Sequence, residues 1–396
     1  MKIKEIRAAA IRSPEEIRLN WKHPKPDPGR PGQGGHRDTW IWANPMSGYP
    51  RLKVDRSLWR MPQSPRLACV VTAEDGTWGL GTTDYSGAVA PIINDQFAPV
   101  LTGEECTATE KLWDMMYRMT SPYGPGLASC AISAVDIALW DLKGKLLGCP
   151  VYTLLGGPAR DQVTCYASGN DPAWHVEQGF RASKLFCRAG PADAAAGLDM
   201  NEDLVSTARE SMPAGTDLML DCWMGLDLEY TVRLAERLRP YRLKWLEDCL
   251  MPEDYDGYAE LRQRIPWQPL GAGEHWFSTL PFFSAAHRRT LEVLQPDINW
   301  VGGITATAKI CHYAEAAGLS VIDHCGGNTA EGQHMAMAMP STPMAEFGIG
   351  VSGVPIRESF QRYPGTAVPE DGCLVPSDAP GLGLEITKEA LEAATA

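Results

Sequence analysis

Three acidic residues end successive short apolar runs at nearly equal spacing. Asp221 ends LMLD, Glu247 ends KWLE and Glu274 ends LGAGE, with steps of 26 and 27 residues between them. Carboxylates that converge repel each other and need a cation, and an all-oxygen ligand set with room for water suits Mg²⁺. We therefore expect these three side chains to form one magnesium site.

The same spacing continues along the chain. Asp297 ends LQPD, 23 residues after Glu274, and His324 ends VIDH, another 27 residues on. An Asp–His pair orients the imidazole and raises its basicity, as proton transfer requires. Glu346, 22 residues further, could hydrogen-bond an oxygen of a substrate. Lys184, in the earlier run SKLF, would stabilise developing negative charge.

Each of these residues also has a purely structural interpretation. A strand-end acid can cap the strand or form a salt bridge, and a lone histidine is more often a satisfied structural residue than a base. Lys184 could form an ordinary ion pair, and Glu346 could close the rim of the fold. The regular steps favour a shared site, because each step has the length of one strand–helix unit.

The runs that carry these residues belong to a repeating pattern. From about residue 163, eight short apolar runs alternate with stretches that are mostly of helical length, which indicates βα units and a parallel sheet. Eight units within about 210 residues fit a (β/α) barrel, whose active site lies at the carboxyl ends of the strands. The expected strands lie at 163–168, 183–186, 217–222, 243–249, 269–274, 293–298, 319–323 and 345–348.

The preceding part of the chain predicts a smaller α+β domain. We expect a strand at 2–12 and a hairpin of strands 67–72 and 77–82, because Asp-Gly between apolar alternations favours a tight turn. Residues 86–120 predict two helical pieces broken near Leu101-Thr102-Gly103. A further helix is expected at 126–147, where apolar residues follow a three-four spacing. We divide the chain into a capping domain (1–125), a barrel (126–370) and a C-terminal segment that returns to the capping domain (371–396).

A long connection separates the first two strands. Residues 19–66 hold eight prolines and five glycines, together with tryptophans and methionines. Disordered segments are usually poor in aromatic residues. We therefore expect a lid that packs on the barrel.

Composition excludes several classes of function. The 396 residues carry a formal net charge of −13, whereas a nucleic-acid backbone or an anionic membrane requires a basic face. No apolar run approaches the length of a membrane span, and the charged N-terminus lacks a secretory h-region. Eleven cysteines without CxxC spacing indicate a reduced, cytoplasmic protein. We expect an enzyme of small molecules.

Several motifs give the chain a specific resemblance. The stretch ISAVDIALWDLKGKLLGCPVYTLLGG (132–157) is followed by LMLDCW, KWLEDC, GAGEH, QPDINWVGGIT and VIDH. In order and spacing these motifs resemble the enolase superfamily, in its mandelate racemase-like branch. The resemblance implies an α+β capping domain on a modified (β/α)₇β barrel, a form of TIM barrel. It also implies Mg²⁺ ligation by Asp221, Glu247 and Glu274, and proton transfer by His324 paired with Asp297.

Within this branch the chain is most similar to L-rhamnonate dehydratases. The segment NPMSGY resembles part of their lid, which implies that His36 and Arg56 hold an acid sugar. The implied reaction removes the proton next to the carboxylate and eliminates the 3-hydroxyl, giving a 2-keto-3-deoxy acid. The resemblance also implies a homo-oligomer, often an octamer.

Two departures from the branch bear on the reaction. Phe186 stands where racemases carry the second lysine of Lys-x-Lys, which argues against a two-base racemisation. CGGNTAEGQHM follows His324, where the rhamnonate group has a serine-rich run. An epimerase or cycloisomerase stays open if His275, His334 or Cys187 supplies a second acid or base. The complete set of site residues argues against a non-catalytic barrel.

Overall fold

The computed structural model describes residues 1–18, 42–54, 59, 65–349 and 353–395. Much of the predicted lid, including His36 and Arg56, lies outside these residues, so their expected contacts with a substrate stay predictions.

The N-terminal part begins with a three-stranded antiparallel sheet in the order β1-β2-β3. Its strands are β1 (Ile3–Ala10), β2 (Leu67–Ala73) and β3 (Trp78–Thr83). The predicted Asp-Gly hairpin is confirmed: the Asp75 carboxylate accepts a hydrogen bond from the backbone N–H of Thr77 at 3.0 Å. Gly76 has φ +90°, a conformation that glycine adopts at low cost.

Helices cover this sheet, and the predicted helical region is interrupted near residue 102 as expected. The elements are α2 (Ser86–Pro91), a π-helix (Ile92–Phe97), α3 (Ala98–Leu101), α4 (Thr109–Thr120) and α5 (Leu127–Leu147), with short 3₁₀ turns η1 (Pro14–Ile17) and η5 (Ser121–Tyr123). One more short helix, α1 (Pro50–Val54), belongs to the lid segment, and its Lys53 pairs with Asp193 of the larger domain.

Helix α5 lies between the small sheet and the larger domain. Its packing on β3 is so close that a Cβ atom at Gly81 would lie 1.9 Å from the carbonyl oxygen of Ala134. On the other side, the buried Asp136 accepts hydrogen bonds from the backbone N–H and hydroxyl of Thr305 at 2.8 and 2.6 Å. Because it contacts both layers, α5 is buried nearly all round, which fits a helix that is apolar on most faces.

The larger domain is the predicted barrel, and all eight expected strands are present. Its strands are β4 (Val163–Ser168), β5 (Ala182–Phe186), β6 (Asp217–Asp221), β7 (Leu246–Glu247), β8 (Leu270–Ala272), β9 (Val293–Leu294), β10 (Ser320–Val321) and β11 (Ala345–Gly348). They run in the order β10-β9-β8-β7-β6-β5-β4-β11, every recorded pairing among them parallel.

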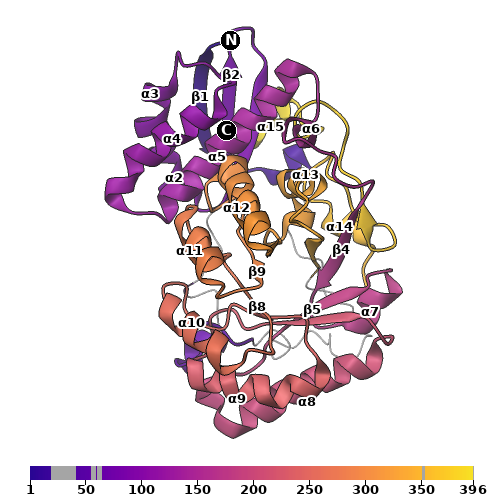
Figure 1. Cartoon of the computed structure of the whole chain (residues 1–396). Coiled ribbons are helices and arrows are strands. Elements are labelled where there is room, and N and C mark those ends of the chain that lie inside the picture. The colour runs from indigo at the N-terminus through magenta and orange to yellow at the C-terminus, as the bar shows by residue number, and fades with distance from the viewer. Residues whose placement is uncertain (19–41, 55–58, 60–64, 350–352, 396) are drawn as a thin grey trace.

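One helix follows each of the first seven barrel strands, as the (β/α)₇β pattern requires (Figure 1). These helices are α7 (Pro172–Glu177), α8 (Ala194–Ser211), α9 (Leu228–Leu238), α10 (Tyr255–Arg264), α11 (Leu280–Arg288), α12 (Gly303–Ala317) and α13 (Ala330–Ala338). The remaining elements are α6 (Val151–Leu154), 3₁₀ turns η6 (Pro191–Asp193), η7 (Arg239–Tyr241) and η8 (Gly326–Asn328), α14 (Ile356–Phe360), β12 (Cys373–Leu374) and α15 (Lys388–Thr395).

The C-terminal end of the chain lies beside the N-terminal sheet (Figure 1). On α15, Leu391 and Ala394 are buried in a cluster with Ile11, Ile17 and Leu80. The exact domain boundaries stay a prediction, since α5 contacts both layers.

All eleven cysteines are free in the structure. Among the described residues, no helix combines the length and the apolar character that crossing a bilayer requires.

The contact between β3 and α5 can be tested with a pair of glycine substitutions. Gly81→Ala forces a methyl group against backbone atoms of α5, and such overpacking typically costs about 1–3 kcal/mol. We expect a clearly lowered melting temperature. Gly87→Ala, in α2, meets no atom within 4 Å and should leave stability unchanged or raise it slightly. Equal melting temperatures in calorimetry at one scan rate would contradict this close packing.

Candidate active site

Three carboxylates converge at the carboxyl end of the barrel. Asp221 and Glu247 are the last residues of β6 and β7, and Glu274 follows β8 by two residues. Each is at most 6% exposed, and each offers an oxygen within 4.8 Å of the others. The equal spacing in the sequence becomes a common position because neighbouring parallel strands present their ends to one face.

A buried ammonium group lies among these carboxylates. Lys184, on β5, is 1% exposed and pairs with Glu247, with Glu346 at 2.8 Å and with Asp221 at 3.6 Å. Burial opposes its charge, but the surrounding carboxylates outweigh this effect and raise the pKa of Lys184 well above its ordinary value.

The carboxylates of Asp221 and Glu247 are buried, as Lys184 is. Burial raises the pKa of Asp221 and of Glu247, although the positive charge of Lys184 acts in the opposite direction. One ammonium therefore does not balance the carboxylates, and a divalent cation would complete the charge balance.

His324 and Asp297 form the pair that the sequence predicts. Asp297 Oδ2 lies 2.8 Å from His324 Nδ1, and His324 Nε2 lies 3.3 Å from Glu274 Oε2. Burial lowers the pKa of His324, but Cys325, Glu274 and Asp297 together raise it well above its ordinary value. The nitrogen that faces the carboxylates is thus Nε2, while Nδ1 is held by Asp297.

Glu346, on β11, completes this face of the site. Its Oε1 accepts hydrogen bonds from Lys184 and from the hydroxyl of Ser168, and its Oε2 accepts from the backbone N–H of Cys325 at 3.0 Å. Burial would raise its pKa, but Lys184 and His324 lower it to about 2. The side chain is therefore an ionised acceptor at neutral pH.

Two residues that support Glu247 are not among the predicted site residues. Glu247 Oε2 accepts hydrogen bonds from Gln295 Nε2 at 2.6 Å and from Trp245 Nε1 at 2.8 Å. As a tryptophan, Trp245 is expected to pack in the core and not to bind a site residue. A signal was available, since residues two apart on a strand face the same side, and Trp245 stands two before Glu247.

A second imidazole lies near the carboxylates. His275 Nδ1 is 3.1 Å from Glu274 Oε1 and 3.5 Å from Asp248 Oδ2. The ring of Trp300 lies 5.7 Å from that of His275 and 5.5 Å from that of His324. Trp300 Nε1 also donates to Asp84 at 3.1 Å, so the loop that follows β3 reaches the site.

The side chains of the other two candidates for a second acid or base have other partners. His334, on α13, is buried and its Nδ1 accepts from the backbone N–H of Tyr152. Cys187 is buried and its thiol donates to the carbonyl of Ala189. The backbone N–H of Cys187 donates to the carbonyl of Asp221 at 2.8 Å, but of the three side chains only that of His275 has a recorded contact with a carboxylate of the cluster.

The described part of the lid packs on the barrel, as expected. Trp42 stacks on Phe186 with ring centroids 4.1 Å apart, and the backbone N–H of Ala43 donates to Cys187 at 2.8 Å. Lys53 pairs with Asp193 at 2.6 Å. Phe186 thus places an aromatic contact at the end of β5, where a second lysine would stand in a racemase.

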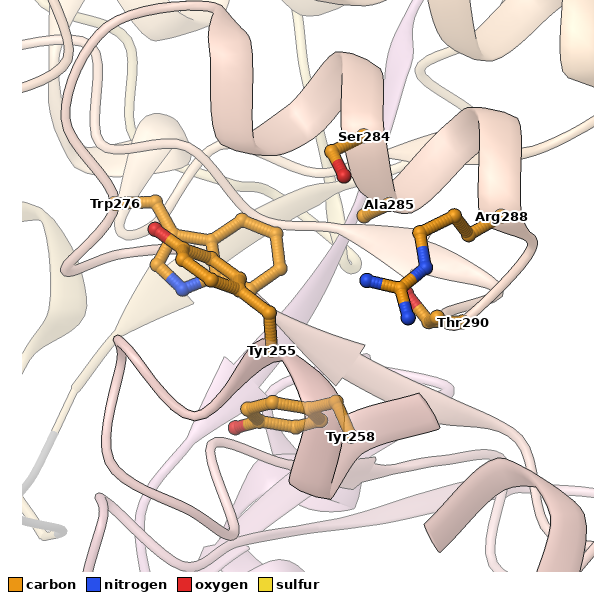
Figure 2. Close-up of a pocket in the computed structure, with 7 residues that line it drawn as sticks. All are labelled: Tyr255, Tyr258, Trp276, Ser284, Ala285, Arg288 and Thr290. Carbon is orange, nitrogen blue, oxygen red and sulfur yellow. The ribbon is translucent and has the colours of Figure 1, made fainter. Parts of the chain in front are cut away.

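A small cavity lies between α10 and α11, apart from these residues (Figure 2). Its volume of about 10 Å³ holds roughly one water molecule. Seven residues line it, including Tyr255, Trp276 and Arg288, and none of them is a predicted site residue.

Two family models match the chain. One, described as enolase C-terminal domain-like, matches residues 172–390, and the other, the N-terminal domain of mandelate racemase and muconate lactonizing enzyme, matches residues 58–156.

Known proteins similar to this chain include dehydratases. An L-rhamnonate dehydratase from Saccharopolyspora erythraea is 41% identical over 315 residues, which is 78% of this chain and 80% of the relative. The crystal structure of rhamnonate dehydratase from Gibberella zeae complexed with Mg is 29% identical, with a TM-score of 0.87 over 99% of this chain and 95% of that one.

A third similar protein has a different named activity. The 3,6-anhydro-D-galactonate cycloisomerase from Zobellia galactanivorans is 25% identical, with a TM-score of 0.75 over the whole of both chains. The two family matches and the fold agree: the chain belongs to the enolase superfamily, in the branch of mandelate racemase and muconate lactonizing enzyme.

Proposed function

We propose that this protein is a Mg²⁺-dependent acid-sugar dehydratase that acts on L-rhamnonate or a closely related acid sugar. One observation carries the proposal: the His324–Asp297 pair faces three converged carboxylates, with an ammonium group beside them. The similarity to an L-rhamnonate dehydratase at 41% identity supports the reaction class.

The chemistry of the donor set fits Mg²⁺. Asp221, Glu247 and Glu274 supply hard carboxylate oxygens, buried and close together, and Mg²⁺ prefers such ligands while keeping room for water and substrate. When bound, the ion acts as a Lewis acid on the substrate carboxylate and makes the neighbouring proton more acidic.

His324 has the geometry of a proton-transfer residue. Its Nε2 points to the carboxylate cluster. A cation on Glu274 would offset part of the negative charge that raises the pKa of His324, and the neutral imidazole then takes the C2 proton of the substrate. Asp297 Oδ2 lies 2.8 Å from Nδ1, where it orients the ring and stabilises the imidazolium that results. The same imidazolium then gives its proton to the leaving 3-hydroxyl, so one residue serves as base and acid.

Lys184 and Glu346 complete the proposed machinery. Lys184 carries a positive charge where negative charge develops on the substrate carboxylate, in a buried place where electrostatic stabilisation is strong. Glu346 is held ionised and accepts a hydrogen bond from a substrate hydroxyl. His36 and Arg56 would bind the distal hydroxyls.

A second candidate function is a cycloisomerase of the same class of substrate. His275, beside Glu274, gives this reading a second imidazole, and the named cycloisomerase shares the fold. The product decides between the two. Dehydration removes the mass of one water and creates a ketone, whereas cycloisomerisation and epimerisation keep the mass of the substrate.

The proposed assembly is a homo-oligomer, with an octamer as the form implied by the family resemblance. The proposed compartment is the cytoplasm, and the proposed partner is a small acid sugar rather than a nucleic acid or a membrane.

The dehydratase proposal is tested by a screen of acid sugars with Mg²⁺. We expect a carbonyl reagent to detect a 2-keto-3-deoxy product from L-rhamnonate, L-mannonate or L-lyxonate. Mass spectrometry of the same samples should show the loss of water. Turnover with an unchanged product mass would contradict dehydration and favour the second candidate.

The role of His324 is tested by His324→Asn. We expect kcat to fall by about 10²–10⁴-fold, the contribution typical of a positioned acid or base, while calorimetry still shows Mg²⁺ binding. His287→Asn, at an exposed position on α11, is the matched control and should keep full activity. Near-normal turnover in the His324 variant would contradict a single-histidine scheme.

The metal site is tested by Asp221→Asn, which keeps the shape of the side chain but removes its charge. We expect at least about a tenfold weaker Mg²⁺ affinity, because loss even of an outer partner of a metal ligand costs about 10–100-fold. Titration calorimetry measures this directly, and Asp161→Asn, at an exposed position, is the control. An unchanged Mg²⁺ affinity would show that the ion binds elsewhere.

A further inference from the structure

A cysteine directly follows the proposed base in an uncommon backbone conformation. Cys325 has φ +51°, in the left-handed region that glycine adopts more readily. Its backbone N–H donates to Glu346 Oε2 at 3.0 Å. This conformation holds the thiol beside the base, with Sγ 3.5 Å from His324 Nε2.

The three side chains form a mixed ligand set that is distinct from the carboxylate cluster. His324, Cys325 and Glu346 each offer one ligand atom within 4.8 Å of the others. In a tetrahedral zinc site, a Zn–S bond of about 2.3 Å and a Zn–N bond of about 2.0 Å place sulfur and nitrogen roughly 3.5 Å apart. The observed separation of Sγ and Nε2 is 3.5 Å.

The surroundings suit a metal on Nε2. Asp297 holds Nδ1 of the imidazole, as carboxylates commonly do behind a histidine that binds zinc. Lys184 pairs with Oε1 of Glu346. Oε2 accepts the backbone N–H of Cys325, and a carboxylate oxygen has a second lone pair that can bind a metal. His324 and Cys325 are partly exposed, so an ion can reach them from solvent.

We propose that His324, Cys325 and Glu346 form a second metal site, which takes Zn²⁺ or another thiophilic divalent ion. Thiolate and imidazole ligands select such ions, whereas the carboxylate cluster suits Mg²⁺. Binding releases the thiol proton to solvent and occupies the Nε2 that proton transfer needs. An ion in this site therefore inhibits turnover even at saturating Mg²⁺. The inhibition, but not the binding, rests on the proposed function.

The binding test uses the full chain saturated with Mg²⁺ and titrated with Co²⁺ as a spectroscopic probe for the zinc site. We expect one Co²⁺ per chain with a thiolate-to-metal charge-transfer absorption. Cys325→Ser should remove this absorption and weaken Zn²⁺ binding by at least about 10–100-fold, the loss that even an outer partner causes. Cys325→Gly, which suits the left-handed conformation, is the second variant should the serine variant fold poorly.

Cys149→Ser and Cys373→Ser are the matched controls, since these two cysteines are also partly exposed and should leave the absorption intact. The proposal is overturned by an absorption that persists in the Cys325 variants, by its absence from the unaltered protein, or by displacement of Co²⁺ as Mg²⁺ is raised.

Activity assays separate this proposal from the proposed function. Co²⁺ absorption that depends on Cys325, in a protein that dehydrates no acid sugar, supports the site and counts against the function. Dehydration of an acid sugar that Zn²⁺ does not inhibit at saturating Mg²⁺ supports the function and counts against the site.

Discussion

The site depends on one buried ammonium group held among carboxylates. Lys184 is 1% exposed and contacts Asp221, Glu247 and Glu346, which come from three other strands. Removing one partner of such a group leaves a buried charge uncompensated, which is strongly destabilising. This constraint ties β5, β6, β7 and β11 together at their carboxyl ends. It also leaves the site with excess negative charge, which is the physical reason for a divalent cation there.

The rest of the fold brings further groups to the same face. Asp297 and His324 follow β9 and β10, and their hydrogen bond at 2.8 Å fixes which nitrogen of the imidazole faces the carboxylates. The capping domain takes part through Asp84, which accepts from Trp300, whose ring lies beside His324. Helix α5, buried between β3 and α12, makes the two domains one packed unit.

Much of this arrangement could be predicted from the sequence, because residues that are one strand–helix unit apart in the sequence lie at the ends of neighbouring barrel strands. The steps between Asp221, Glu247 and Glu274 predict their convergence, and the resemblance to a family adds expected roles. Contacts that depend on side chains from separate strands could not be predicted in this way. Gln295 donates a hydrogen bond to Glu247 although the two are 48 residues apart in the sequence. That His275, and not His334, lies beside the carboxylates follows only from where each helix and loop lies.

Proton NMR in D₂O tests the central claim most directly. The Mg²⁺-loaded protein is incubated with L-rhamnonate, and the C2 proton and the product are followed together. We predict that the C2 signal disappears only as a 2-keto-3-deoxy acid forms, with deuterium at C3 from the solvent. Exchange at C2 without loss of water would contradict dehydration, and inversion at C2 in the exchanged sugar would indicate an epimerase. No exchange and no product with any acid sugar would contradict proton abstraction by His324.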